Sequence, residues 1–169
     1  MNYIGALFIV FAALAIGISK AMESRRQVKE LYAAISMLET VKNEISSRRT
    51  PIFEIFAGLS SSNNRYIKSF SEAVIENSDR LSELGFYEIW CGCVISELSA
   101  LTQNALEEMS RVGRNLGRYD AELQKSALDR CISSLSAEYA NTKDALKSNE
   151  KMYIGLGGGA GLILALVLI

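Results

Sequence analysis

Two long uncharged apolar segments form the ends of this chain, and they constrain the fold more than any other feature. Residues 154–169 (IGLGGGAGLILALVLI) contain no charged side chain. Counted from Met152, the segment has 18 residues. As a helix with a rise of about 1.5 Å per residue it spans about 27 Å, close to the ~30 Å hydrocarbon core of a bilayer. We therefore expect a C-terminal transmembrane helix over residues 151–169.

The N-terminal segment is also uncharged and apolar over residues 4–18 (IGALFIVFAALAIGI). A secretory signal peptide is the competing interpretation. However, no Lys or Arg precedes the apolar run and no Ala-x-Ala cleavage site follows it. We expect a retained transmembrane helix over residues 1–22.

Charged residues are confined to the region between these two segments. All acidic residues lie between Glu23 and Glu150, so residues 23–150 form one polar region, long enough for one compact domain and too short for two. The flanking basic residues are Lys20, Arg25, Arg26 and Lys29 after the first apolar segment, and Lys143, Lys147 and Lys151 before the second. By the positive-inside rule, we expect a multi-pass membrane protein whose polar domain is cytosolic.

Charge and cysteine content exclude several classes of site. The formal net charge is −1 and no Lys/Arg-rich face resembles a nucleic-acid footprint, so we expect no nucleic-acid partner. The chain has no His and three cysteines, Cys91, Cys93 and Cys131, which gives neither a complete disulfide framework nor a Cys/His metal site. We expect three reduced, packed thiols and no cofactor.

Helical periodicity runs through the whole polar region. Val28, Leu31, Ile35, Leu38, Val41 or Lys42, and Ile45 recur at steps of three and four, which predicts a helix extending from the first apolar segment to about Ser47. A second long stripe begins after Asp120, with Leu128, Ile132, Leu135, Tyr139, Thr142 and Leu146. Because both long helices must reach the same membrane, we expect them to be antiparallel and to form a stalk.

Shorter helices are predicted between these two. Thr50 and Pro51 read as the N-cap and first position of a second helix, and residues 65–76 as a third helix burying Ile67, Phe70 and Val74. Thr102 is expected to cap a helix that ends near Gly113, Leu116 and Gly117. The predicted fold class is all-α, a cytosolic antiparallel bundle of about six helices between two terminal transmembrane helices.

Aromatic residues gather in residues 81–101. The apolar side chains of this stretch are Leu84, Phe86, Tyr87, Ile89, Trp90, Val94, Ile95, Leu98 and Leu101. Such a stripe is typical of a bundle core rather than of a ligand site, and we assign it to the core.

One cluster of charged residues resembles an active site. It consists of Glu107, Glu108, Arg111, Arg114 and Arg118. They could be an acid pair with a phosphate clamp. At spacings of three and four residues, however, Glu107 and Glu108 can pair with Arg111 on a solvated helix face. We favour this second interpretation, and predict no catalytic site and no small-molecule substrate.

Glycines interrupt the C-terminal apolar segment. Gly155 and Gly159 satisfy the GxxxG pattern, Gly157 and Gly161 repeat it, and Gly158 lies between them. Small residues at this spacing let two membrane helices approach closely. We therefore predict a packing face here, with the first transmembrane helix or a second protein, including another copy of the chain, as the partner.

Several short motifs occur together in this layout. They are Leu38-Glu39-Thr40 with Glu44-Ile45, Thr50-Pro51, Leu116-Gly117 with Asp120 and Gln124, and Glu150-Lys151-Met152-Tyr153 before the glycine-rich segment. With the N-terminal span and its basic helix, they give the whole chain a layout that resembles the stage III sporulation protein AB family of endospore-forming bacteria. The sequence departs from the family at Thr50-Pro51-Ile52-Phe53-Glu54, where Pro commonly directly precedes Glu, and residues 86–93 match no family motif.

The resemblance implies a function that periodicity alone does not give. Members of this family belong to the membrane complex that links the mother cell to the forespore after engulfment. Their domain is similar to the cytoplasmic helical domains of type II secretion and type IV pilus platform proteins. The resemblance thus implies a non-enzymatic platform or adaptor in the membrane surrounding the forespore, in contact with a secretion-type ATPase and other channel proteins.

Two further interpretations remain open at the level of sequence. The chain could be a membrane-anchored regulatory or sensor module whose bundle binds a signalling partner. It could also be an enzyme anchored by both ends, which would require an activity dependent on a Glu or an Arg.

Overall fold

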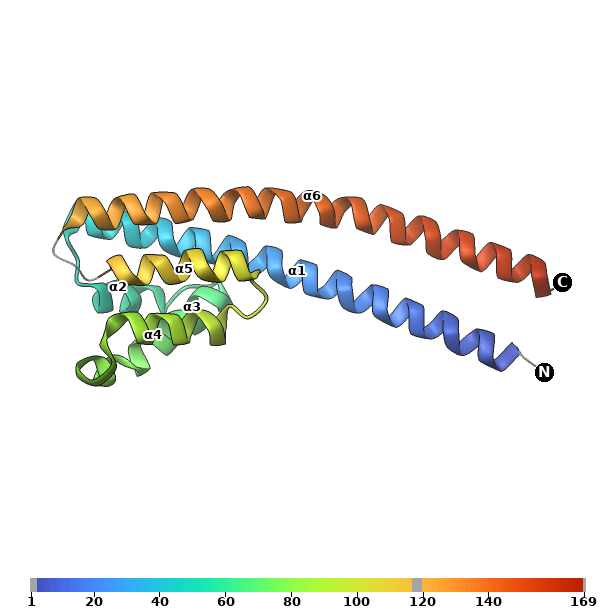
Figure 1. Cartoon of the computed structure of the whole chain (residues 1–169), viewed down its shortest axis with the longest axis horizontal. Coiled ribbons are helices and arrows are strands. Elements are labelled where there is room, and N and C mark those ends of the chain that lie inside the picture. Colours follow the sequence, from blue (N-terminus) through green and yellow to red (C-terminus); the bar gives the residue numbers. More distant parts are fainter. Residues whose placement is uncertain (1–2, 117–119, 169) are drawn as a thin grey trace.

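The computed structural model describes the backbone of residues 3–116 and 120–168, and the side chains of residues 19–116, 120 and 122–148. Within these ranges the structure contains six α-helices, one short 3-10 helix and no strand, which confirms the predicted all-α class (Figure 1). The elements are α1 (Tyr3–Arg48), α2 (Ile52–Leu59), α3 (Arg65–Glu76), η1 (Ser78–Arg80), α4 (Leu81–Glu97), α5 (Gln103–Asn115) and α6 (Ala121–Leu168).

The two longest helices, α1 and α6, lie side by side and run antiparallel, as the sequence predicted (Figure 1). Both chain ends lie at one end of this pair, and the short helices pack at the other end. Two contacts define the register of the pair. The Lys42 ammonium lies 2.9 Å from a carboxylate oxygen of Asp129, and the rings of Tyr32 and Tyr139 lie 6.2 Å apart between centroids.

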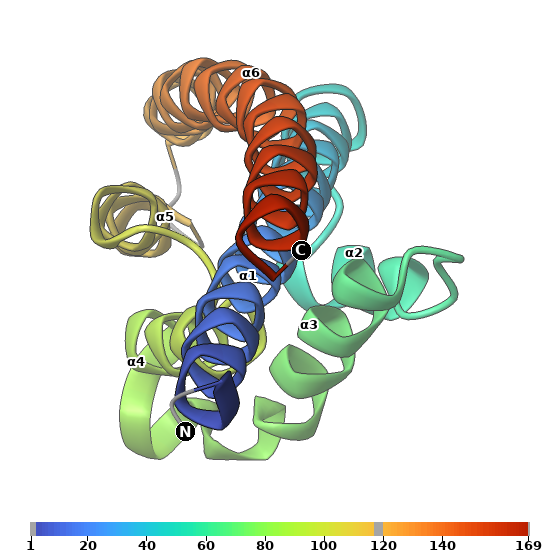
Figure 2. The same cartoon turned by 90° about the vertical axis from the view of Figure 1, so that its right-hand side faces the viewer.

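Helix α1 occupies the middle of the bundle (Figure 2). It contacts α6 along one side and α2 and α3 along another. Leu31, Leu38 and Val41 of the predicted stripe are buried, and Ala33, Ala34 and Met37 are buried as well. The buried face is therefore wider than the stripe read from the sequence, because Ala33, Ala34 and Met37 also lie in the core.

The start of α2 differs from the prediction by one residue. Helix α2 begins at Ile52, Pro51 occupies the N-cap position, and no side chain caps the helix. The Thr50 hydroxyl, which we expected to cap α2, instead donates a hydrogen bond of 2.9 Å to Glu44 in the last turns of α1. The prediction of a Thr50 cap is wrong because α2 begins one residue later than predicted. Pro51 therefore occupies the N-cap position, and Thr50 donates to a carboxylate six residues earlier in the chain instead.

Other helix boundaries follow their local signals. Helix α3 spans the predicted residues 65–76, and the Asn64 side chain accepts a hydrogen bond from the Tyr66 N–H. Thr102 caps α5 as predicted, because its hydroxyl accepts from the Ala105 N–H at 3.2 Å. Side-chain oxygens at these positions satisfy amide groups that have no partner inside the helix.

Helix α4 carries the centre of the aromatic core. Trp90 is fully buried, lies against Phe56, Phe70 and Phe86 at ring-centroid distances of 5.1 to 6.0 Å, and donates its indole N–H to the Met109 carbonyl at 2.7 Å. The core assignment of this stretch is confirmed for Trp90 and its neighbours.

The outer positions of α4 correct that assignment. Ile95 is 64% exposed and Leu84 is 38% exposed, so the prediction that they belong to the core is wrong. Gly85, next to Leu84, has a φ of 77° and kinks the helix. This left-handed backbone conformation favours glycine, and the kink displaces the first turn of α4 from the regular helix that the periodicity assumed.

The predicted transmembrane helices fall on residues 1–22 and 151–169, and most of their side chains lie outside the described residues. In the part of the chain that the structure does describe, no helix combines the length and the apolar character needed to cross a bilayer. The two spans remain predictions from the sequence.

We predict opposite effects for alanine at two glycines of the bundle. A Cβ at Gly113 would lie 2.3 Å from a ring carbon of Trp90, whereas a Cβ at Gly92 has no neighbour within 4 Å. Gly113→Ala should lower the free energy of unfolding by about 1–3 kcal/mol through overpacking. Gly92→Ala should leave it unchanged or raise it by about 0.5–1 kcal/mol, because alanine favours the helix.

Trp90 is the one tryptophan in the sequence, so its fluorescence during urea unfolding of the full chain in mild detergent reports on this core. Equal stability of the two variants would contradict the close approach of α5 to Trp90.

Candidate functional site

The predicted basic residues after the first apolar segment lie on the exposed surface of α1. Lys20, Arg25, Arg26 and Lys29 are all exposed, and Lys147 of α6 is exposed as well. Lys20 forms a loose ion pair of 3.7 Å with Glu23. The structure describes only the backbone at Lys151 and at the glycines of the predicted packing face, which are Gly155, Gly157, Gly158, Gly159 and Gly161. The packing face therefore stays a prediction.

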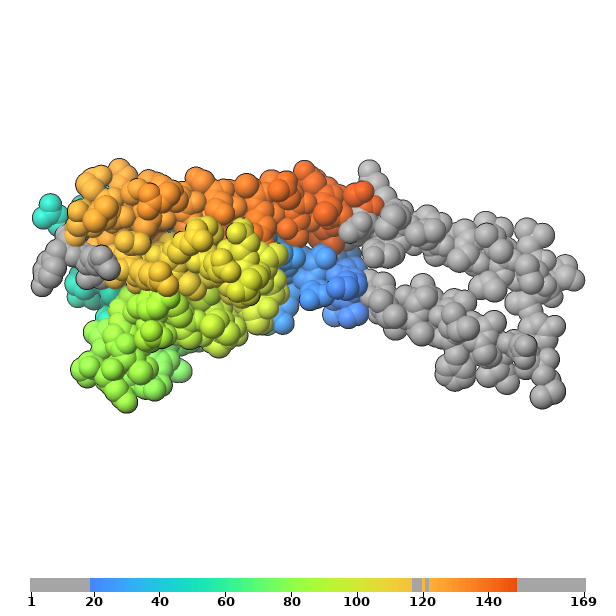
Figure 3. All heavy atoms as spheres, in the orientation of Figure 1, coloured from blue at the N-terminus to red at the C-terminus, as the bar shows by residue number. Residues whose placement is uncertain are grey.

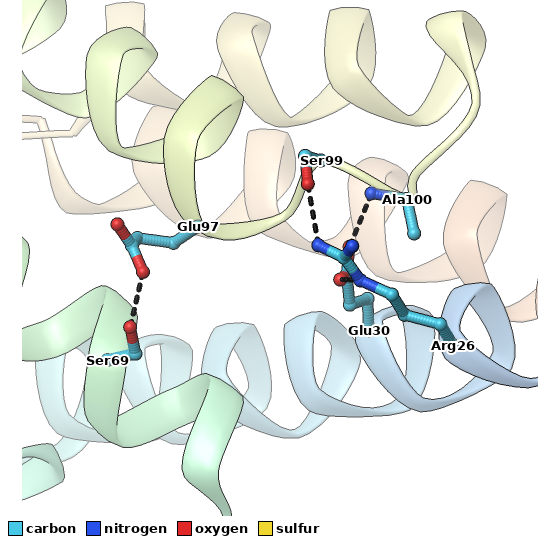
Figure 4. Close-up of polar contacts among 6 residues, drawn as sticks. All are labelled: Arg26, Glu30, Ser69, Glu97, Ser99 and Ala100. Atoms are coloured by element: carbon cyan, nitrogen blue, oxygen red, sulfur yellow. Dashed lines mark hydrogen bonds and ion pairs between the residues drawn. The ribbon is translucent and has the colours of Figure 1, made fainter. Parts of the chain in front are cut away.

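Arg26 has a second role that the sequence did not reveal. Its Nε donates a hydrogen bond of 2.7 Å to the Glu30 carboxylate, and its Nη2 donates one of 2.6 Å to the Ser99 hydroxyl (Figure 4). Glu30 is fully buried, and its other oxygen accepts a hydrogen bond of 2.8 Å from the Ala100 N–H. These four residues, which we call the loop clamp, fasten the α4–α5 loop to α1.

Each part of the loop clamp has a physical reason. The carboxylate of Glu30 is removed from water, which is costly for a charge unless hydrogen bonds and an opposite charge replace the solvent. One oxygen receives the guanidinium and the other receives the amide, so both are satisfied. The hydrogen bond to Glu30, and then the attraction of its charge, raise the pKa of Arg26 above its ordinary value.

A second polar contact ties α4 to its other neighbour. The Ser69 hydroxyl of α3 donates to the carboxylate of Glu97, at the end of α4 (Figure 4). Directly after Glu97, Leu98 and Leu101 are buried in the core. The end of α4 and the α4–α5 loop are thus held by apolar packing and by polar contacts to α1 and α3.

The sequence contains one local signal for the loop clamp. Arg26 and Glu30 are four residues apart, which is a common surface pair on a helix. Glu30 directly precedes Leu31 of the predicted apolar stripe, so a carboxylate adjoins the buried face. Its loop partners, Ser99 and Ala100, are about 70 residues away in the chain, and no local pattern predicts them.

The Glu/Arg cluster of α5 lies beside a hollow of about 450 Å³ between α5 and α6. Glu108 and Arg111 form the predicted ion pair at 2.7 Å, while Glu107 accepts from Gln103. Arg114 donates to the Tyr87 hydroxyl at 3.2 Å rather than to a carboxylate. Arg118 lies outside the described residues. The predicted Glu108–Arg111 ion pair is thus confirmed, and no Glu107–Arg111 pair is found among the described residues.

All three cysteines are free thiols, as the sequence predicted. Cys93 and Cys131 are buried, and Cys91 is partly exposed. Burial raises the pKa of Cys93 to about 11, and burial followed by the nearby Glu108 charge raises the pKa of Cys131 to about 12. Among the described residues, no group of three or more His, Cys, Asp or Glu side chains is arranged to hold a metal ion.

Comparison with known proteins gives one family. The family model described as Stage III sporulation protein AB matches residues 2–169. The protein named Stage III sporulation protein AB from Bacillus subtilis (strain 168) is 29% identical over 178 aligned residues, which cover 99% of this chain and 99% of that protein. No solved structure matches the chain significantly.

We predict that Glu30 stabilises the fold far more than an exposed carboxylate on the same helix. Glu30→Ala leaves the Ala100 N–H and the Arg26 guanidinium without their acceptor. It should lower the free energy of unfolding by about 2–4 kcal/mol, because each hydrogen bond to the charged carboxylate contributes about 1.5–3 kcal/mol. Glu39→Ala, at an exposed position of α1, is the matched control and should change it by less than about 0.5 kcal/mol.

Hydrogen exchange provides a second measurement for the same pair of variants. The Ala100 amide should lose its protection in Glu30→Ala and keep it in Glu39→Ala. Unchanged protection of Ala100 in the Glu30 variant would show that the loop is not held by this carboxylate.

A further prediction concerns thiol reactivity in the folded chain. At pH 7.5 a maleimide should modify Cys91, while Cys93 and Cys131 stay protected, because they are buried and remain protonated until the pH approaches about 11 and 12. Cys91→Ser should therefore remove labelling of the native protein, and urea should restore labelling at the other two thiols. Rapid native labelling of Cys91→Ser, followed by mass spectrometry, would contradict this burial.

Proposed function

Because the chain belongs to the stage III sporulation protein AB family, as its motifs predicted, we propose that it is a non-enzymatic membrane platform of the sporulation apparatus. In this proposal it is an adaptor subunit of the secretion-like channel between mother cell and forespore, and it contacts the cytosolic ATPase of that channel. Family membership supports a role in sporulation, and the arrangement of the helices supports the platform role.

The observation that carries the proposal is the antiparallel pairing of α1 and α6. Both helices continue without a break from the bundle toward the same end of the molecule, where the apolar segments begin (Figure 1). The register set by Lys42 with Asp129, and by Tyr32 with Tyr139, continues along both helices to bring Lys20 level with residue 151. The two predicted spans would thus enter one membrane at the same depth.

The end of the bundle farthest from these apolar segments is the surface we assign to the ATPase. The first turn of α4 lies there, next to the kink at Gly85 (Figure 1). Leu81 and Leu84 are 39% and 38% exposed at this tip. Leu81 and Leu84 are one helical turn apart, so together they form a small apolar surface that a partner protein could cover.

The loop clamp connects this tip to the membrane-proximal part of α1. Helix α4 begins at the tip, and the loop that follows it is bound to Arg26 and Glu30. A force applied at Leu81 or Leu84 would therefore pass through α4 into α1, close to the predicted membrane boundary. This path suits a subunit that transmits motion of an ATPase.

We predict that polar substitutions at the tip separate ATPase binding from membrane anchoring. Leu81→Ser with Leu84→Ser should reduce co-purification of the ATPase from sporulating cells in mild detergent by about tenfold, because the exposed apolar contact is lost. The matched control is Ile95→Ser, the same kind of change at an exposed position near the other end of α4. It should leave co-purification unchanged, and both proteins should stay in the membrane fraction.

Two results would contradict the proposal. Recovery of the intact chain from the soluble fraction would remove the membrane platform. Absence of the ATPase and of the channel ring proteins from the unmodified complex, with a signalling protein in their place, would favour the regulatory module instead.

A separate pair of changes, Gly155→Leu with Gly159→Leu, should preserve membrane insertion and weaken assembly if the glycines form a packing face.

A further inference from the structure

The hollow between α5 and α6 carries positive charge that the described residues do not neutralise. Arg114 donates to the Tyr87 hydroxyl and Arg130 donates to the Ser126 hydroxyl, so neither guanidinium has a carboxylate partner among the described residues. Arg111 is paired with Glu108. Ala127, Arg130 and Ser134 line the α6 side of the hollow. This groove therefore presents two cations with no anionic partner.

An exposed leucine lies beside the same face of α6. Leu123, Ala127, Arg130 and Ser134 follow one another at steps of four, three and four, which places them on one side of a helix. Leu123 is 54% exposed. The α5–α6 face thus combines cationic and apolar side chains, which is the composition of a protein-binding surface rather than of a plain solvated face.

A second hollow, of about 320 Å³, lies between α1 and α2 and has the opposite charge. It is lined by Thr40 and Glu44 of α1 and by Glu54, Gly58 and Leu59 of α2. Arg48 neutralises part of the Glu44 charge through an ion pair of 3.2 Å. Glu54 is exposed and has no ion-pair partner among the described residues. Gly58 leaves open space in which a neighbouring side chain would fit.

The two hollows lie at one level along the stalk and on opposite sides of it. The ion pair of Lys42 with Asp129 makes residues 40–44 of α1 level with residues 127–131 of α6. Viewed from the end that carries both termini, α5 and α2 flank the α1–α6 pair on opposite sides (Figure 2). On the surface view, α5 and α6 form one continuous face (Figure 3).

We propose that the α5–α6 groove of one molecule receives the α1–α2 edge of a second copy of this chain. Arg114 and Arg130 of one copy would pair with Glu54 of the next, and Ser134, one turn after Arg130, would lie toward Gly58, one turn after Glu54. This inference rests on the membrane anchoring in the proposed function, because anchoring holds all copies in one orientation. The contact joins two different surfaces, so it is heterologous and builds an arc or a ring in the membrane plane.

A second copy fits the groove better than a small anion does. A phosphate site needs donors that converge on one point, whereas Arg111, Arg114 and Arg130 are engaged with three different partners along the groove. Glu108 also lines the hollow and would repel a small anion. An extended edge with its charges spaced apart matches this distribution.

Cysteine cross-linking of the full chain in mild detergent tests the contact. In a Cys91→Ser background, Gly58→Cys and Ser134→Cys are introduced separately and together, and a short bis-maleimide is added. The doubly substituted chain should give a ladder of dimers, trimers and larger species. Each singly substituted chain should stay monomeric, and a mixture of the two should give dimers only.

Charge reversal identifies the interaction within this contact. The yield of cross-linked species should fall about tenfold in either of two variants, because like charges then face each other. One variant combines Arg114→Glu with Arg130→Glu, and the other is Glu54→Arg alone. Combining the three substitutions should restore most of the ladder. Their matched control is Lys125→Glu, an exposed charge on α6 outside the hollow, which should leave the ladder unchanged.

Three results would overturn the proposal. They are the absence of any ladder, dimers formed by a single-cysteine chain, and failure of the combined charge reversals to restore cross-linking. A different result would assign the groove to another partner. In that case the Arg114→Glu and Arg130→Glu changes release a bound acidic protein, and the ladder persists in Glu54→Arg. Membrane fractionation and ATPase co-purification report separately on the proposed function, so its failure is distinguishable from the failure of self-association.

Discussion

The pairing of α1 with α6 is the constraint on which the rest of the structure depends. Each helix alone would expose an apolar stripe, and together they bury Leu31, Leu38, Leu128 and Leu135 completely. Burying such a side chain contributes about 1.5–3 kcal/mol. Two long helices could pair in several axial registers. The Lys42–Asp129 ion pair and the Tyr32–Tyr139 contact favour one of them. Helices α2, α3 and α5 pack against this pair, and α4 is attached to it through α3 and α5.

The short helices are attached to the α1–α6 pair in two different ways. At the distal part the attachment is apolar, with Trp90 filling the space between Phe56, Phe70 and α5. Nearer the chain ends it is polar, through Glu30 and the α4–α5 loop. Apolar packing tolerates small slides, whereas a carboxylate with two directional hydrogen bonds does not. The polar attachment therefore gives the loop a defined position, close to where α1 approaches the predicted membrane.

Local sequence signals predicted most of the fold, and their failures have specific physical causes. The ends of α3 and the caps at Asn64 and Thr102 depend only on neighbouring residues. The exposure of Ile95 and the kink at Gly85 depend on which helices lie beside α4, and a periodic pattern does not contain that information. The Thr50 cap failed because α2 begins at Ile52, which leaves Pro51 at the N-cap, and the Thr50 hydroxyl donates to a carboxylate of the preceding helix instead. The loop clamp could not be predicted because its halves are about 70 residues apart.

The same reasoning explains why the proposed function is assigned to surfaces rather than to a pocket. In the described part of the chain the buried polar groups satisfy one another: Glu30 is saturated by Arg26 and Ala100, and Ser71 donates to a backbone carbonyl of its own helix. Among the described residues, no buried side-chain nitrogen or oxygen is left without a hydrogen-bond partner. The unneutralised charges are instead exposed, on Arg114 and Arg130 on one side and Glu54 on the other. A rigid stalk with opposite charges on its two flanks and leucines at its tip has three separate surfaces, which suits a subunit that joins neighbours laterally and a motor axially.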